Sequence, residues 1–230
     1  MTSVIEYSDK ATRDYNQDFV SWLSLSDSAS IYVLADGMGG YSHGDIAAKV
    51  VSESIIEYVG QNVEKLNPTE LLKDAISYAN DCLMLKKLAL SVKQMGSVIA
   101  ILLIVENEAF ITWLGDSRIY LYRNSMEVYR SKDHSVINEL YKIETLRVID
   151  LEKYSNIVTK SVMGTDKIDD VEIFKIKIEK GDVFVLCSDG VHKQFPVSLI
   201  AEKAQEVLTD MTEFSKVALD NISFLRVEIV

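Results

Sequence analysis

Five aspartates stand where apolar runs of the sequence begin or end. Asp36 and Asp189 each end a run just before a glycine, Asp116 lies in a GDS turn signal, and Asp18 and Asp220 stand at the starts of runs. Any one of them has a plain reading as a turn former. Strand ends at one edge of paired sheets converge, however, and several carboxylates gathered there repel one another unless a cation lies between them. Hard divalent cations such as Mg²⁺ and Mn²⁺ accept this all-oxygen ligation, so the pattern indicates a metal site.

Glycines follow the first strand-end aspartate at high density. The stretch from Val33 to Gly44 reads VLADGMGGYSHG, with four glycines in the eight residues after Asp36. A glycine loop after a strand lets the backbone approach a ligand closely, and it would let the carbonyl of Gly37 turn toward the same ion as Asp36. A dinucleotide-binding loop is the alternative, but GMGGYS lacks the third glycine of that template.

Hydrophobic periodicity predicts the elements that must position these residues. Asn67 and Pro68 form a capping signal for the longest predicted helix. Three strands between residues 97 and 130 predict a β-meander, and a turn at 179–182 joins two later strands. Runs of strands alternate with pairs of helices, which favours an α+β fold with largely antiparallel sheets. The predicted strands are residues 4–8, 19–25, 31–35, 97–105, 109–115, 118–123, 171–178, 183–187 and 222–230, and the predicted helices are 45–61, 68–90, part of 132–151, 198–208 and 211–219.

Length and composition limit the class of protein. The chain has 230 residues, and this length fits a single domain over residues 1–230. Its apolar content is 48% and its net charge is −11. The negative charge argues against nucleic acid as a partner, because a phosphate backbone needs a basic footprint. No apolar run is long enough to span a bilayer, the first ten residues lack a secretory pattern, and the two cysteines form no disulfide framework. We therefore expect a cytoplasmic protein that does not bind membranes.

Seven motifs in a fixed order carry a family resemblance. They are RDYNQD, ADGMGGYSHG, MGS, LGDSRIY, DHS, LCSDGV and DNIS, and the match runs from Arg13 to Asn221. In this order they resemble the metal-dependent serine/threonine protein phosphatases, the PP2C-like or PPM family, in its bacterial form. The resemblance implies a four-layer α-β-β-α sandwich, in which helices flank two largely antiparallel sheets. It also implies hydrolysis of phosphoserine and phosphothreonine in proteins.

The resemblance assigns roles to the strand-end aspartates. It implies that Asp36 bridges two Mn²⁺ or Mg²⁺ ions, with the carbonyl of Gly37 on one ion. Asp189 and Asp220 are expected to complete the shell of the other ion. Such a pair can share a water, lower its pKa and hold it in line with phosphorus, so no covalent phosphoenzyme is needed. Asp116 resembles the aspartate of a third, weaker metal site.

Arg13 matches the arginine that binds substrate phosphate in the family. A planar guanidinium suits this task, because it can donate two parallel hydrogen bonds to a phosphoryl group. The alternative for Arg13 is a surface salt bridge. In the same motif, Gln17 stands where many relatives have glutamate, so one ion would lose a ligand that acts directly or through water. We expect neighbouring Asp18 to compensate.

Two further positions depart from the family pattern. Met38 stands where animal relatives have a histidine that is thought to protonate the leaving group, which leaves a metal-bound water or His43 as the acid. Lys193 stands where an acid usually completes the third metal site. A charged lysine cannot ligate a cation, so the sequence argues against a third ion and predicts that Lys193 pairs with Asp116.

Three functions remain open at this point. The leading one is a monomeric phosphatase that acts on proteins phosphorylated by a serine/threonine kinase. The second is a degenerate relative that binds a phosphoprotein without turnover, which Gln17 and Lys193 support and the four core aspartates oppose. The third is an enzyme of small phosphorylated metabolites, for which no pocket motif is present. Cys187 does not indicate a cysteine phosphatase, because no arginine closes a phosphate loop after it.

Overall fold

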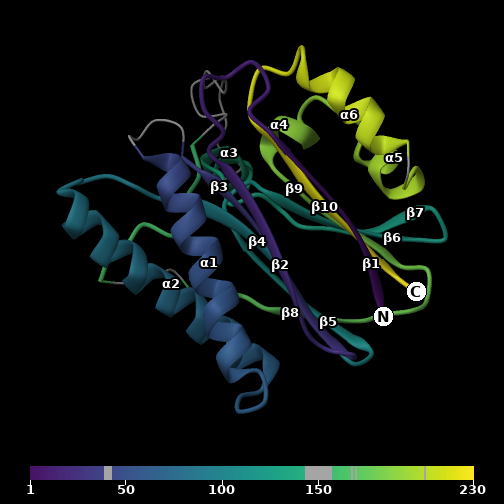
Figure 1. Ribbon diagram of the computed structural model, residues 1–230, viewed down its shortest axis with the longest axis horizontal. Coiled ribbons are helices and arrows are strands. Elements are labelled where there is room, and N and C mark those ends of the chain that lie inside the picture. The colour runs from purple at the N-terminus through teal and green to yellow at the C-terminus, as the bar shows by residue number, and fades with distance from the viewer. Residues whose placement is uncertain (39–42, 143–156, 167, 169, 205) are drawn as a thin grey trace.

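The computed structural model describes residues 1–38, 43–142, 157–166, 168, 170–204 and 206–230. Two five-stranded antiparallel sheets pack face to face, and helices cover the outer face of each sheet (Figure 1). The predicted α+β class and the four-layer α-β-β-α sandwich are therefore confirmed. The two chain ends lie side by side (Figure 1), and the backbone N–H of Val230 donates to the carbonyl of Met1 at 3.1 Å.

The first sheet consists, in spatial order, of β2 (Asp18–Ser26), β3 (Ala29–Gly37), β4 (Ser97–Val105), β5 (Glu108–Leu114) and β8 (Phe174–Lys177). Its outer face is covered by α1 (Gly44–Asn62) and α2 (Pro68–Leu90). β3 and β4 are apolar on both faces, because one face meets these helices and the other meets the second sheet. Asn67 caps α2 as predicted, since its side chain accepts hydrogen bonds from the backbone N–H groups of Thr69 and Glu70.

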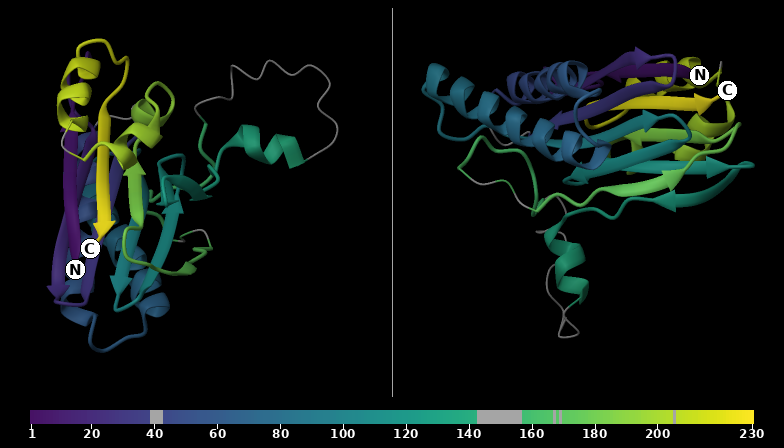
Figure 2. Two further views of the ribbon diagram at one scale, coloured as in Figure 1. Left: turned by 90° about the vertical axis from the view of Figure 1, so that its right-hand side faces the viewer. Right: turned by 90° about the horizontal axis from the view of Figure 1, so that it is seen from below.

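The second sheet consists, in spatial order, of β1 (Thr2–Asp9), β10 (Ile222–Ile229), β9 (Val183–Cys187), β6 (Arg118–Arg123) and β7 (Met126–Arg130). The short helices α4 (Asp189–His192), α5 (Val197–Glu202) and α6 (Val207–Ser215) lie on its outer side (Figure 1). Another helix, α3 (Val136–Lys142), projects away from the sandwich (Figure 2).

The interface between the two sheets is a continuous apolar layer. Tyr32 and Leu34 from β3 meet Phe184 from β9 and Leu225 from β10, and all four side chains are fully buried. Burial of each such side chain stabilises the fold by roughly 1.5–3 kcal/mol. This layer fixes one sheet against the other, and it therefore also fixes the distances between the loops at their ends.

The predicted β-meander over residues 97–130 is wrong in part. β4 and β5 pair as expected, but β6 lies in the second sheet and pairs with β9 and β7. The GDS segment thus crosses between the sheets, and the turn at 179–182 does the same between β8 and β9. A turn signal marks a chain reversal, but it does not say whether the next strand pairs with the previous one or joins the facing sheet.

Other boundaries also differ from the prediction. β7 was not predicted, because its five residues are mostly exposed and lack an apolar run. α5 is shorter than the predicted helix 198–208, whereas α6 has the length of the predicted helix 211–219 but begins four residues earlier. Only residues 174–177 of the strand predicted at 171–178 pair. α3 confirms a partly helical segment after residue 132, whereas residues 143–151 lie outside the described part of the chain. Among the described helices, none is long and apolar enough to cross a membrane.

Candidate active site

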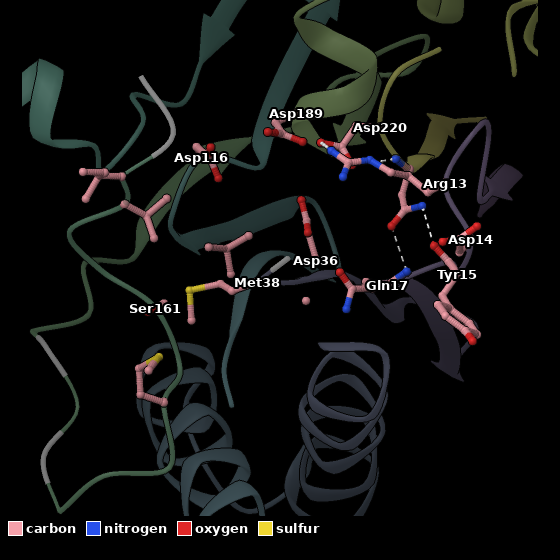
Figure 3. Close-up of a pocket in the computed structure, with 16 residues that line it drawn as sticks. Arg13, Asp14, Tyr15, Gln17, Asp36, Met38, Asp116, Ser161, Asp189 and Asp220 are labelled. Carbon is pink, nitrogen blue, oxygen red and sulfur yellow. Dashed lines mark hydrogen bonds and ion pairs between the residues drawn. The ribbon is translucent and has the colours of Figure 1, made fainter. Parts of the chain in front are cut away.

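A cavity of about 840 Å³ opens where loops from both sheets meet (Figure 3). Besides Asp14, four carboxylates at the ends of strands or helices line it, from Asp36 at the end of β3, Asp116 after β5, Asp189 at the start of α4 and Asp220 before β10. Their side chains converge on one space in Figure 3. The structure therefore brings together the strand-end aspartates that the sequence pattern singled out.

Asp18 lies directly opposite Asp36 in the register of β2 and β3. Burial raises the pKa of Asp18 to about 7, hydrogen bonds with Ser188 and Ser223 partly offset this, and neighbouring carboxylates raise it further. The pKa of Asp36 lies well above its usual range, first because the carboxylate loses hydration and then because Asp18 and three other aspartates repel its charge. Asp18 Oδ2 is buried and has no hydrogen-bond partner among the described groups. A cation beside this pair would oppose both shifts and favour the ionised carboxylates.

Gly37 allows β3 to pack against the start of α1. A Cβ atom at Gly37 would overlap the backbone of Gly44, and a Cβ at Gly44 would lie 2.6 Å from Gln17 Nε2. The backbone N–H of Gly37 also donates to the carbonyl of Gln17 at 2.9 Å. Close backbone packing therefore requires glycine here, in addition to the carbonyl freedom that the sequence suggested. Gly39 and Gly40 lie outside the described residues.

Lys193 contributes an ammonium at the other side of the site. Its Nζ lies 2.8 Å from Asp189 Oδ2 and 3.9 Å from Asp116 Oδ2. The pKa of Asp116 is raised to about 6, first by burial and then by Asp189, while Lys193 opposes the shift. The predicted proximity of Lys193 and Asp116 is present, but the shorter contact is with Asp189.

His192 supports the same turn and was not predicted from the sequence. Its ring is partly buried, and burial followed by the charge of Arg118 lowers its pKa to about 4. The ring is thus neutral near pH 7, and Nε2 donates to the backbone carbonyl of Asp116 at 2.9 Å. The only sequence signal for this role is the position of His192 three residues after Asp189.

Arg13 and Asn221 connect the loop before β2 to the segment before β10. Arg13 Nη2 donates to Asp220 Oδ2 at 3.0 Å and Nε donates to the carbonyl of Leu219 at 2.9 Å. Asn221 accepts a hydrogen bond from the backbone N–H of Gln17 and donates to the carbonyls of Lys10 and Tyr15. Arg13 therefore forms the salt bridge that was the alternative to phosphate binding, while its side chain remains 55% exposed at the cavity. No signal in the sequence beyond the DNIS motif predicts the structural role of Asn221.

The donor atoms of the site suit a hard divalent cation. In the described part of the chain, no three acidic, histidine or cysteine side chains already form a closed metal cage. Asp189 and Asp220 instead contact Lys193 and Arg13. The carboxylate oxygens around the cavity and the unpartnered Oδ2 of Asp18 are nevertheless the ligand types that Mg²⁺ and Mn²⁺ prefer.

Comparison with known proteins identifies the family. The sequence profile of Protein phosphatase 2C matches residues 7–221. The chain belongs to the protein phosphatase 2C family. The protein phosphatase PhpP of Streptococcus pneumoniae is 30% identical to this phosphatase over 207 residues, which cover 87% of this chain and 84% of PhpP. The family prediction from the seven motifs is thus confirmed.

Solved structures of other phosphatases share the fold. The S. agalactiae serine/threonine phosphatase superposes with a TM-score of 0.82 at 25% identity and covers all of both chains. The catalytic domain of the phosphatase PstP, solved with 2 manganese ions, superposes with a TM-score of 0.79 at 21% identity and covers 100% of this chain and 98% of that one. The sandwich of this phosphatase is therefore the family fold.

Proposed function

We propose that this phosphatase hydrolyses phosphoserine and phosphothreonine in proteins at the cavity of Figure 3. The observation that carries the proposal is the convergence of four aspartates on one cavity with Arg13 at its edge. The relatives named protein phosphatase and serine/threonine phosphatase support the same reaction and substrate class. We assign the activity to a single domain over residues 1–230.

We assign a pair of Mn²⁺ or Mg²⁺ ions to the carboxylates of Asp36, Asp189 and Asp220 and the carbonyl of Gly37. The unpartnered carboxylate oxygen of Asp18 and the manganese ions of the PstP structure support this assignment. When bound, such ions lower the pKa of a shared water and offset the charge on the phosphoryl oxygens. We expect Gln17 and Asp18 to act on the ions indirectly, by orienting water or the ligating carboxylates.

We expect Arg13 to bind the substrate phosphate. Its side chain is 55% exposed at the cavity, so an incoming phosphate can reach it. Its two hydrogen bonds, with Leu219 and Asp220, use two of the five guanidinium donors. The remaining donors can bind phosphoryl oxygens while Nε keeps the side chain oriented.

The proton for the leaving group comes from water in this proposal. Met38 lines the cavity but carries no proton to donate. His43 is exposed at the N-terminus of α1 and is not among the described residues that line the cavity. These positions favour water over His43 as the acid.

The other functions receive less support. The relatives are named phosphatases, which favours turnover over phosphoprotein binding without turnover. Cys187 is fully buried in β9, and burial raises the pKa of its thiol, which opposes thiolate chemistry. The cavity opens to solvent between loops, and this suits a phosphorylated segment of a protein better than a small metabolite that has to be enclosed.

We further propose a monomeric cytoplasmic enzyme whose substrates are products of a serine/threonine kinase, with neither nucleic acid nor membrane as a partner. The net charge of −11 supports the exclusion of nucleic acid. The two cysteines, Cys82 and Cys187, are both free, which suits a reducing compartment.

The direct test is phosphate release by the purified protein, from p-nitrophenyl phosphate and then from phosphoserine and phosphothreonine peptides. We expect release with Mn²⁺, its loss in EDTA and its return when Mn²⁺ is added in excess. Asp189→Asn is the matched inactive variant. Undiminished release in EDTA would contradict the metal assignment, and tight peptide binding without release would favour the binding-only alternative.

A further inference from the structure

Lys193 places an ammonium between two carboxylates of the cavity. Its Nζ lies 2.8 Å from Asp189 Oδ2 and 3.9 Å from Asp116 Oδ2. Lys193 follows α4 directly, and its backbone N–H donates to the carbonyl of Asp189 at 3.0 Å. The helical spacing of four residues therefore holds the lysine side chain beside Asp189.

The ammonium contacts two carboxylates that line the cavity. Asp116 and Asp189 line the cavity, whereas Lys193 is not among the described lining residues. His192 donates to the backbone carbonyl of Asp116 from the same end of α4. Two consecutive residues thus connect α4 to the turn that carries Asp116. His192 bonds to the main-chain carbonyl of Asp116, and Lys193 contacts its side-chain carboxylate.

The charge of Lys193 bears on any ion that binds nearby. Its Nζ lies within ion-pair distance of two carboxylates, and such neighbours favour the charged ammonium form of a lysine. A divalent ion that used both Asp116 and Asp189 would have to lie within a few ångströms of the ammonium. Two like charges at that distance repel strongly in a partly buried site.

We propose that Lys193 is a positioning residue that acts as a built-in cation, bridging Asp189 and Asp116 and keeping a third divalent ion away from Asp116. This inference rests on the proposed function, because it concerns the ions of the same cavity. Divalent ions are then limited to the pair assigned to Asp36, Gly37, Asp189 and Asp220. The third ion that the family resemblance implies at Asp116 does not fit this chain.

Counting bound Mn²⁺ tests the proposal without a measurement of activity. Electron paramagnetic resonance of free Mn²⁺ gives the number of ions bound per chain, and calorimetry gives their dissociation constants. The variants are Lys193→Met, which removes the charge, and Lys193→Arg, which keeps it. Lys175→Met is the matched control, because the Lys175–Glu108 pair between β8 and β5 has the same 2.8 Å separation and does not line the cavity.

We expect Lys193→Met to bind one more Mn²⁺ per chain than the unmodified protein, and to bind the other ions roughly fivefold more tightly because no ammonium competes for Asp189. Lys193→Arg and Lys175→Met should match the unmodified protein. Adding Asp116→Asn to Lys193→Met should abolish the extra ion, which locates it at Asp116. Lys193→Gln is the second charge-free variant, in case the methionine variant folds poorly.

Two results would overturn the proposal. One is an unchanged ion number in both Lys193→Met and Lys193→Gln. The other is loss of an ion from the unmodified protein when Asp116→Asn alone is introduced. Phosphate release is measured in parallel, so that failure of the proposed function can be told apart from failure of the role proposed for Lys193. Mn²⁺ binding as expected without phosphate release would reject the proposed function, whereas normal release with an unchanged ion number in the variants would reject only the role of Lys193.

Discussion

The two sides of the cavity bring carboxylates together in different ways. On one side, Asp18 and Asp36 face each other across β2 and β3, and neither forms an ion pair with any described lysine or arginine. On the other side, Asp189 and Asp116 share the ammonium of Lys193. The chain supplies its own cation at one pair of carboxylates and none at the other. The side without a chain cation is therefore where we expect a metal ion to matter most.

The largest expected effect comes from removing the charge of Asp36. Asp36→Asn keeps the size of the side chain but removes a carboxylate from the side that lacks a chain cation. We expect kcat for p-nitrophenyl phosphate in saturating Mn²⁺ to fall on the order of 10³-fold, because electrostatic stabilisation of the phosphoryl group is lost. The circular dichroism spectrum should stay unchanged.

Asp27→Asn is the matched control for this variant. Asp27 is exposed in the turn at the opposite end of the same β2–β3 hairpin. It should leave kcat unchanged. Equal activity of Asp36→Asn and Asp27→Asn would remove the proposed distinction between the two sides.

The next largest effect is on the pH dependence of the free energy of unfolding when metal ions are removed with EDTA. The folded-state pKa of Asp18 is about 7 and its usual value is 3.8. The folded protein therefore holds this proton more tightly than the unfolded chain, so stability is full below about pH 4 and falls as the pH rises toward 7. The loss for one such group is on the order of a few kcal/mol. In EDTA, the melting temperature should fall across this window, and Asp18→Asn should flatten the fall.

Asp116 provides the comparison for this measurement. Its pKa is raised only to about 6, because Lys193 opposes the effect of burial and of Asp189. Asp116→Asn should therefore flatten the pH dependence less than Asp18→Asn does. A larger effect at Asp116 would show that the chain cation does not separate the two sides as we describe.

The smallest expected effect is that of Arg13→Ala. We expect KM for a phosphopeptide to rise about tenfold, as for loss of one charge-assisted hydrogen bond, with Mn²⁺ affinity nearly unchanged. The exposed pair with Asp220 should contribute less than about 1 kcal/mol to the free energy of unfolding. If calorimetry showed weaker Mn²⁺ binding while KM stayed constant, Arg13 would be a structural partner of Asp220 instead.

Much of the fold follows from local sequence patterns. The apolar run of β4, the helical periodicity of α2 and the Asn67 cap predicted those elements near their observed bounds. Each of these signals depends on neighbouring residues, so it can be read without knowledge of the rest of the chain. The short exposed strand β7 has no such signal, and only its pairing with β6 makes it a strand.

The sequence by itself determined the family and the aspartates at strand ends, because motif order and turn signals are properties of the linear chain. Only the tertiary structure decided that the segments after β5 and after β8 cross between the sheets. It also decided that Asp18 faces Asp36 and that Lys193 lies between Asp189 and Asp116. The physical reason is that charge interactions and burial depend on distances between segments far apart in the chain, and the packing of the two sheets sets those distances.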